Sequence, residues 1–180
     1  MIYYKRSKGI QPYFTFKVFY GIITYLYFGG EKMEINFRHI NEKDRQKVLE
    51  MMRVFYASPA VSTNGSDEIF NADIDNCIGG SPYLEGFVFE NDGNIEGYAM
   101  LAKSFSTEFG MPCVWIEDIY IKEEARGHGI GKKFFAYIEE SYKGAIFRLE
   151  VEEDNERALA LYKKCGFDFL PYLEMKKEVK

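Results

Sequence analysis

The stretch 114–142 constrains the fold more than any other part of the chain. It opens with apolar and aromatic residues over 114–121, interrupted only by Glu117 and Asp118, which is typical of a strand buried on both faces. A glycine-rich turn over 126–131 follows, and apolar residues then recur at helical spacing. The pattern predicts a strand, a turn and a helix in direct succession.

The turn Arg126-Gly127-His128-Gly129-Ile130-Gly131 has the composition of an anion site. Glycines let a ligand approach the main chain, and the first turn of the following helix presents unpaired N–H groups. Lys132 and Lys133 follow without the hydroxyl residue that a nucleoside-triphosphate loop requires, and the spacing G-x-G-x-G differs from the dinucleotide fingerprint. The remaining expectation is the phosphate or pyrophosphate of another ligand.

A second pattern lies downstream, in 150–167. Asn155 and Tyr162 are seven residues apart, so on a helix they share a face with Ala158 and lie about 10 Å apart along its axis. Each residue also has a purely structural interpretation. Asn155 can cap a helix, and a tyrosine at helical spacing is most often a core residue.

The pattern Arg126-x-x-Gly129-x-Gly131 after a strand, with Asn155 and Tyr162 further on, resembles the acetyl-CoA-binding motif of the GCN5-related N-acetyltransferase (GNAT) family. The resemblance covers most of the chain after residue 33. It implies an α/β fold, with a mixed central sheet of about six to seven strands flanked by about four helices. It also implies acetyl-CoA as the cofactor.

The segment Trp115-Ile116-Glu117-Asp118-Ile119-Tyr120 is most similar to the diamine (polyamine) acetyltransferase branch. The resemblance implies that Tyr162 protonates the leaving thiolate and that Glu117 accepts a proton from the amine or orients it. Asp118 is expected to contact the substrate charge, on the opposite face from Glu117, because adjacent strand residues alternate. For Glu117, a carboxylate held by structural hydrogen bonds is the alternative. The expected cofactor-binding residues are Ile119, Tyr120, Ile121, Arg126, Gly127, His128, Gly129, Ile130, Gly131, Lys132, Asn155, Ala158 and Tyr162.

The implied activity is direct transfer of an acetyl group to a primary amine of a small molecule or peptide. A non-catalytic acyl-CoA-binding module of the same fold is the alternative, against which Tyr162 and Glu117 argue. The net charge is −5, and the excess of acidic residues lies after residue 32. This acidic character argues against a nucleic-acid partner and suits a cationic amine. Three cysteines without a C-x-x-C pair, and two histidines, predict no metal site and fit the cytoplasm. A homodimer is common among the resembling proteins.

Residues 1–32 differ in character from the rest. The apolar run 14–28 follows a basic start, but it contains Lys17 and is shorter than the roughly 20 residues that span a bilayer, so no membrane partner is expected. The run 29–33, Gly-Gly-Glu-Lys-Met, is what a purine-rich ribosome-binding sequence and start codon would encode. A mis-assigned start, a membrane anchor or a flexible or amphipathic arm, and an extra structural segment are the open interpretations. The acetyltransferase domain is predicted over 33–180.

Periodicity and turn residues predict the other elements. Gly97 indicates a bulge or a close backbone approach, and Gly166 is expected to end the last helix in a left-handed conformation. Strands are expected at 34–39, 84–90, 95–105 and 145–151, with a hairpin turn at 91–94 and a closing strand or pair at 167–169 and 172–177. Helices are expected at 42–56, 66–78 and 155–165.

Overall fold

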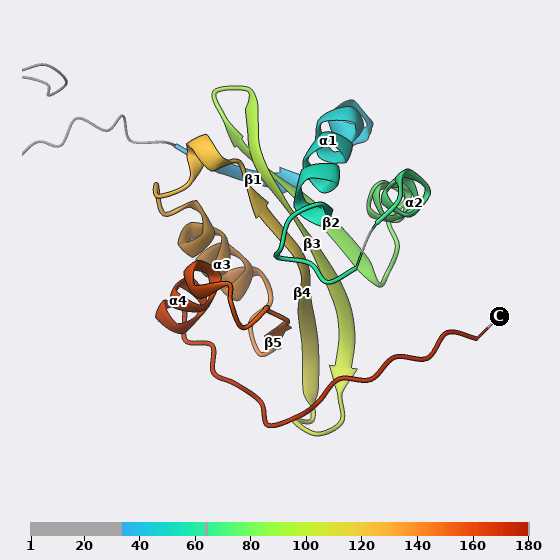
Figure 1. The fold of residues 1–180 in the computed structure, drawn as a ribbon, viewed down its shortest axis with the longest axis vertical. Helices are drawn as coiled ribbons and strands as arrows, with labels where there is room; N and C mark the ends of the chain where they lie inside the picture. Colours follow the sequence, from blue (N-terminus) through green and yellow to red (C-terminus); the bar gives the residue numbers. More distant parts are fainter. Residues whose placement is uncertain (1–33, 64, 180) are drawn as a thin grey trace, which may run out of the picture. The chain divides into compact units, whose positions relative to one another are not determined.

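The computed structural model describes residues 34–63 and 65–179 of the 180-residue chain. Our predictions for residues 1–32, and for a domain start at residue 33, lie outside this part. The described part contains a mixed sheet in the order β1-β2-β3-β4-β5, with helices on both faces (Figure 1). The strands are β1 (Asn36–His39), β2 (Leu84–Asn91), β3 (Asn94–Ser106), β4 (Met111–Ile121) and β5 (Ile146–Leu149). The helices are α1 (Arg45–Tyr56), α2 (Asp67–Ile78), α3 (Ile130–Ser141) and α4 (Glu156–Lys164), with 3-10 turns η1 (Glu42–Asp44) and η2 (Glu123–Ala125).

Strand direction changes once across the sheet. The strands β1 to β4 pair antiparallel, whereas β4 and β5 pair parallel. A parallel pair needs a crossover connection, and α3 supplies it on one face of the sheet. None of the helices in the described residues is both long and apolar enough to cross a bilayer.

Most predicted elements are confirmed, together with the local chemistry that starts and ends them. Ser66 caps α2, because its hydroxyl accepts a hydrogen bond from the Ile69 amide at 3.3 Å. Gly166 follows α4 with a φ of 87°. At Gly97, an added Cβ would lie 2.4 Å from the carbonyl oxygen of Tyr120, which explains why this strand position has no side chain.

The predicted closing strands at 167–169 and 172–177 are wrong, and the sheet has five strands rather than six to seven. The described residues after α4 form no helix or strand. Pro171 interrupts the alternation there and has no N–H to donate to a ladder. The hydroxyl of Tyr172 instead donates a 2.7 Å hydrogen bond to Glu108, in the β3–β4 turn.

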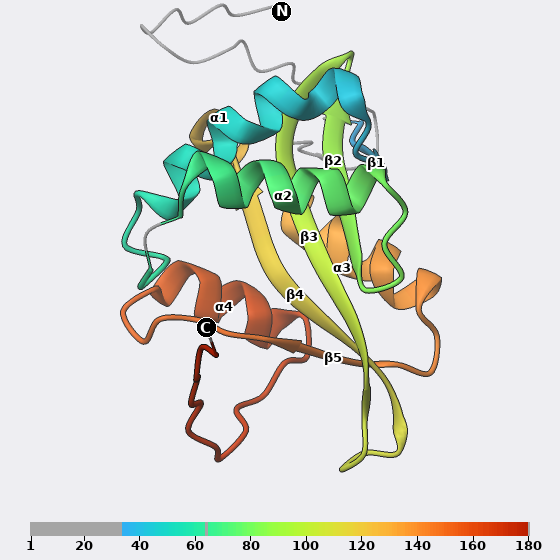
Figure 2. The same cartoon turned by 90° about the vertical axis from the view of Figure 1, so that its right-hand side faces the viewer.

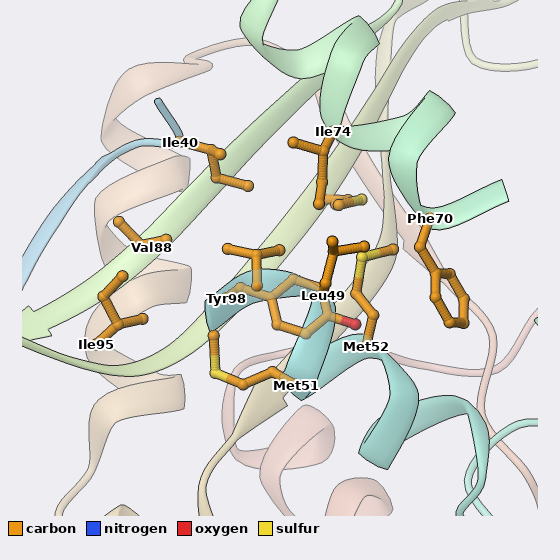
Figure 3. Packing of buried hydrophobic residues seen from close by; sticks show 11 residues of the cluster. Ile40, Leu49, Met51, Met52, Phe70, Ile74, Val88, Ile95 and Tyr98 are labelled. Atoms are coloured by element: carbon orange, nitrogen blue, oxygen red, sulfur yellow. The ribbon is translucent and has the colours of Figure 1, made fainter. Parts of the chain in front are cut away.

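Apolar side chains fill the layers on both sides of the sheet. Figure 2 shows α1 and α2 side by side across one face, with α3 behind the other. Figure 3 shows the cluster beneath α1 and α2, with side chains from the helices meeting side chains from β2 and β3. On the opposite face, Phe134 of α3 is fully buried and lies 4.7 Å from Phe89, centroid to centroid. The cluster comprises Ile40, Val48, Leu49, Met51, Met52, Phe70, Ile74, Val88, Ile95, Tyr98 and Met100.

A bulge in β4 breaks the regular alternation of side chains. Ile116 pairs with Leu101 and Asp118 pairs with Met100, so Glu117 is the extra residue. Trp115 and Asp118 therefore share a face although they are three residues apart. Our prediction that Glu117 and Asp118 lie on opposite faces assumed unbroken alternation. The bulge interrupts that alternation at Glu117 itself.

The bulge also lies where β4 and β5 part. Their parallel pairing runs from Cys113 opposite Ile146 to Ile116 opposite Leu149 and goes no further. Beyond it, the edge of β4 over 117–121 that faces away from β3 has no strand partner among the residues described. The pairing of β4 with β5 thus ends before β4 does, and the unpartnered part of β4 leads into the glycine turn.

Candidate active site

The glycine turn forms an open cradle at the start of α3. Gly127 and Gly129 have φ values of 88° and 75°, in the left-handed region that favours glycine. A Cβ added at either position would meet no protein atom within 4 Å, so the space above the main chain is free for a ligand. Gly129 caps α3 without a side-chain hydrogen bond, which leaves the first-turn amides available to an anion.

Gly131 has a different use from its two neighbours. A Cβ there would lie 2.8 Å from Cδ2 of Leu161, so the absent side chain allows α4 to pack closely on α3. Its amide still belongs to the first turn of α3, with those of Ile130 and Lys132. The predicted turn therefore combines an open ligand face with a packed helix face.

Two side chains of the turn are fixed by main-chain carbonyl groups. The Nε atom of Arg126 donates to the carbonyl oxygen of Ile121 at 2.7 Å, and its guanidinium lies 5.7 Å from the Tyr120 ring centroid. The Nδ1 atom of His128 lies 3.1 Å from the carbonyl oxygen of Ala125, so this nitrogen carries the proton. These bonds connect the turn to the unpaired end of β4.

The helix α4 places Asn155 and Tyr162 as the spacing predicts. The side chain of Asn155 accepts a hydrogen bond from the Ala158 amide at 3.2 Å, so Asn155 does cap the helix. The ring of Tyr162 packs edge-to-face with Phe135 and tilted against Phe167, at 5.8 and 5.9 Å between centroids. Tyr162 also lines a cavity of about 540 Å³ between β5, α4 and the segment after it.

The hydroxyl of Tyr162 is available for chemistry. It makes no hydrogen bond within the described part of the chain, where every fully buried polar side-chain atom has a partner. The hydroxyl is therefore reached by solvent although the ring is largely covered. Burial raises the pKa of Tyr162 to about 12, so the group is protonated at neutral pH.

Three glutamates gather beside this cavity. Glu117, Glu150 and Glu174 line a smaller hollow of about 170 Å³, which shares Trp115 and two of these glutamates with the larger cavity. Burial, followed by the charges of Glu174 and Asp73, raises the pKa of Glu117. A hydrogen bond that protonated Glu150 donates to Glu174, followed by burial and nearby charges, raises the pKa of Glu150 to about 7. The hollow is therefore a negatively charged pocket next to Tyr162.

Asp118 lies behind this pocket rather than in it. Its side chain is 3% exposed, and its two oxygens accept hydrogen bonds from Tyr56 at 3.1 Å and Tyr98 at 3.0 Å. Burial raises its pKa to about 6, against the opposing effect of the two tyrosines. The structure thus brings Glu117 and Tyr162 to adjoining hollows, whereas Asp118 lines neither.

The sequence analysis missed three residues of the site. Glu150, Glu174 and Arg148 line the larger cavity, but no role was predicted for any of them. For Arg148 and Glu150 a signal existed, because residues two apart at the end of a strand point the same way. For Glu174 there was none, since its place depends on the irregular path after α4. The described residues contain no group of three or more His, Cys, Asp or Glu positioned to hold a metal ion.

The open cradle at the start of α3, the unpartnered edge of β4 and the acidic pocket have the form expected of an acyltransferase whose acyl carrier bears phosphate. Residues 48–167 match the acetyltransferase (GNAT) family, and the chain belongs to this family. It is an acetyl-CoA-dependent N-acetyltransferase that transfers the acetyl group to a primary amine. The resemblance seen in the sequence is thereby confirmed, including its polyamine acetyltransferase-like branch.

Curated relatives cover most of the chain. A thialysine N-epsilon-acetyltransferase of Sus scrofa is 32% identical over 142 residues, which are 72% of this chain and 81% of the relative. A spermine/spermidine N(1)-acetyltransferase of Bacillus subtilis (strain 168) is 27% identical over 143 residues, which are 76% of this chain and 90% of the relative. Both proteins are named for acetylating a nitrogen of a small amine.

Solved structures share the fold. A possible acetyltransferase from Clostridium difficile 630 superposes with a TM-score of 0.69 at 18% identity, covering 81% of this chain and 98% of that one. An aminoglycoside N-acetyltransferase in complex with CoA superposes with a TM-score of 0.66 at 16% identity, covering 82% and 97%. At these identities the likeness concerns the fold alone.

Proposed function

We propose that the chain acetylates a small, multiply charged amine, either a polyamine or an amino acid with a side-chain amine. The observation that carries this proposal is the pocket formed by Glu117, Glu150 and Glu174 beside Tyr162. Three carboxylates around one hollow attract an ammonium group together, more strongly than a single carboxylate does. The names of the two relatives support the same substrate classes.

The turn and the β4 edge would hold the cosubstrate. The amides of Ile130, Gly131 and Lys132, at the positive end of α3, would bind the pyrophosphate of acetyl-CoA, with Gly127, His128 and Gly129 leaving room for it. Arg126 adds positive charge at the rim. The edge of β4 over Ile119, Tyr120 and Ile121 that has no strand partner among the described residues would pair with the pantetheine amides, although the Ile121 carbonyl already accepts a hydrogen bond from Arg126. Asn155 and Ala158, at the start of α4, would contact the same arm. Acetyl-CoA supplies the activated thioester.

Glu117 is suited to prepare the amine for attack. An ammonium group has no free electron pair, so a proton must leave it before a nitrogen–carbon bond forms. Because burial raises the pKa of Glu117, its carboxylate holds a proton more strongly than an exposed glutamate does. We therefore assign to Glu117 the role of base, acting directly or through water. Asp118 positions the bulge that carries Glu117, through its bonds to Tyr56 and Tyr98.

Tyr162 is suited to complete the transfer. When the new nitrogen–carbon bond forms, the carbon–sulfur bond breaks and a thiolate leaves. A tyrosine with a pKa of about 12 remains protonated at neutral pH and can donate to that sulfur. Its hydroxyl has no competing hydrogen bond in the described residues, so nothing must be broken first.

Release of the free CoA thiol tests the activity and its substrate class together. Purified protein is supplied with acetyl-CoA and, in turn, spermidine, L-lysine, a short peptide and an aminoglycoside. Turnover with spermidine or L-lysine well above the peptide supports the proposal. Saturable CoA binding without turnover on any amine would favour a non-catalytic acyl-CoA-binding module instead.

We also infer that the protein acts as a homodimer in the cytoplasm. The side chains of Leu173 and Met175 are 97% and 93% exposed, which is unusual for apolar residues and supports a covering partner. Cys77, Cys113 and Cys165 are free thiols, which supports a reducing compartment. Sedimentation velocity of the full chain checks the dimer, and fractionation of the source cells checks the location.

A further inference from the structure

Arg148 lines the larger cavity without forming a salt bridge to any described residue there. It lies on β5 directly opposite Trp115 of β4, and its guanidinium carbon is 4.3 Å from the centroid of that ring. Within the described part of the chain it makes no hydrogen bond and no ion pair, although it lines the same cavity as Tyr162. The cation–π contact holds the guanidinium over the Trp115 ring, while its N–H donors remain available to a ligand.

Arg148 has a carboxylate for a neighbour. Glu150 is two residues further along, about 6.6 Å at the rise of a strand, and both side chains line the cavity. Glu150 lines the smaller hollow together with Glu174 and Glu117, so the guanidinium lies near a small carboxylate cluster. One positive and one negative group side by side match the carboxylate and the ammonium of an α-amino acid.

A substrate that carries only positive charges fits this arrangement less well. Its ammonium groups would be attracted to Glu117, Glu150 and Glu174, but Arg148 would repel them in the same cavity. A free amino acid would be attracted by both kinds of group. Its ammonium groups would interact with the glutamates, and its carboxylate would pair with the guanidinium of Arg148 in a bidentate manner. Arg148 therefore disfavours the binding of polyamines and favours the binding of amino acids.

We propose that Arg148 and Glu150 form a clamp for the head group of a diamino acid, which directs its side-chain amine toward Glu117 and Tyr162. This inference rests on the proposed function, and it selects one of the two substrate classes named there. The clamp acts on recognition and leaves the acetyl transfer step to the residues already described.

The test compares L-lysine with 1,5-diaminopentane, which differs from it only by lacking the carboxylate. The wild-type protein should turn over L-lysine with at least about tenfold higher kcat/KM, with acetylation on the side-chain nitrogen. Arg148→Gln should lower kcat/KM for L-lysine about ten- to hundredfold, mainly through KM, as expected for a lost charged hydrogen-bond pair. The same variant should raise kcat/KM for 1,5-diaminopentane, because a repelling charge is removed, and Arg148→Lys should restore part of the preference for L-lysine.

A second cation of the cavity provides the matched control. Lys163 lines the same cavity from α4, where its ammonium lies 5.4 Å from the Phe169 ring centroid. Lys163→Gln removes the same charge but should keep the preference for L-lysine. The clamp is overturned if the wild type has equal kcat/KM for the two amines. It is also overturned if Arg148→Gln and Lys163→Gln lower kcat/KM for both amines to the same extent.

A binding measurement distinguishes failure of the clamp from failure of the proposed acetyltransferase activity. Calorimetric titration of L-lysine into the CoA-saturated protein reports on the clamp without any turnover. Saturable binding that is lost in Arg148→Gln supports the clamp even where no amine is acetylated, a result that would count against the proposed function alone. No saturable binding of L-lysine to the wild type overturns the clamp, whichever amine is turned over.

Discussion

The carboxylate of Asp118 accepts a hydrogen bond from the hydroxyl of Tyr56 at 3.1 Å, across 62 positions of the chain. Tyr56 is the last residue of α1, and Asp118 directly follows the extra residue of the β4 bulge. A second bond, from Tyr98 of β3, satisfies the other oxygen. This buried arrangement connects a helix end to the strand position that carries Glu117.

Asp118→Asn should change how stability depends on pH. Because burial raises the pKa of Asp118 from 3.8 to about 6 in the folded state, its contribution is fully present below pH 3.8 and is lost as the pH rises through about 6. The full difference is on the order of 3 kcal/mol. Asparagine does not titrate, so the variant should gain stability relative to the wild type between pH 4 and pH 7. Urea unfolding at both values measures this; parallel pH profiles for the two proteins would contradict it.

Tyr162→Phe should reduce turnover with little effect on folding. The change removes the proposed proton donor to the thiolate, and general acid catalysis typically contributes about 10²- to 10⁴-fold. We expect kcat to fall within that range, with little change in KM for acetyl-CoA. Tyr137→Phe on α3 is the matched control, since that ring stacks on Phe134 away from the cavity. A Tyr162→Phe protein with wild-type kcat would exclude the assignment.

Glu117→Gln should remove the acidic limb of the activity profile. In the wild type, activity should fall as the pH drops through the raised pKa of Glu117, because the protonated group cannot accept a proton. The variant should be slower by about 10²-fold and should not show that limb. The measurement is kcat/KM against pH with saturating acetyl-CoA. Glu68→Gln, on the exposed side of α2, should behave as the wild type. An unchanged limb in Glu117→Gln would assign the titration to another group.

Gly129→Ala should weaken CoA binding more than it weakens the fold. The φ of 75° costs an alanine about 1–2 kcal/mol, and the added methyl would project into the open space above the turn. Gly144→Ala is closely matched, with a φ of 81° and equally open surroundings, but it lies between α3 and β5. Both variants should lose similar stability in urea unfolding, while only Gly129→Ala should raise the Kd for CoA. Equal Kd values would show that the turn does not hold the ligand.

The glycine turn and the α4 pattern could be predicted because their information is local. Gly129 and Gly166 adopt the left-handed conformations that their neighbours in the sequence require. Asn155 stands at the start of its helix, where a capping residue belongs. These features depend on spacing over a few residues, and the sequence shows spacing directly.

The bulge and the cavity could not be predicted because they depend on partners far away in the chain. Glu117 becomes an extra residue only in register with β3, and a single strand carries no sign of that register. Asp118 is buried because tyrosines from α1 and β3 reach it. Arg148 and Glu150 acquire a shared use only when α4 and the segment containing Glu174 enclose them. The closing strands failed for a local reason, the interruption at Pro171.

The early end of the β4–β5 pairing has a consequence for amide hydrogen exchange. The backbone groups of Ile119 to Ile121 on that edge are matched by no strand, so a bound pantetheine arm would serve as the missing neighbour. Deuterium uptake over these residues should slow when CoA is added, while uptake in β2, enclosed between β1 and β3, stays the same. The pantetheine arm would then extend the five-stranded sheet beside β4 for as long as the cosubstrate is bound.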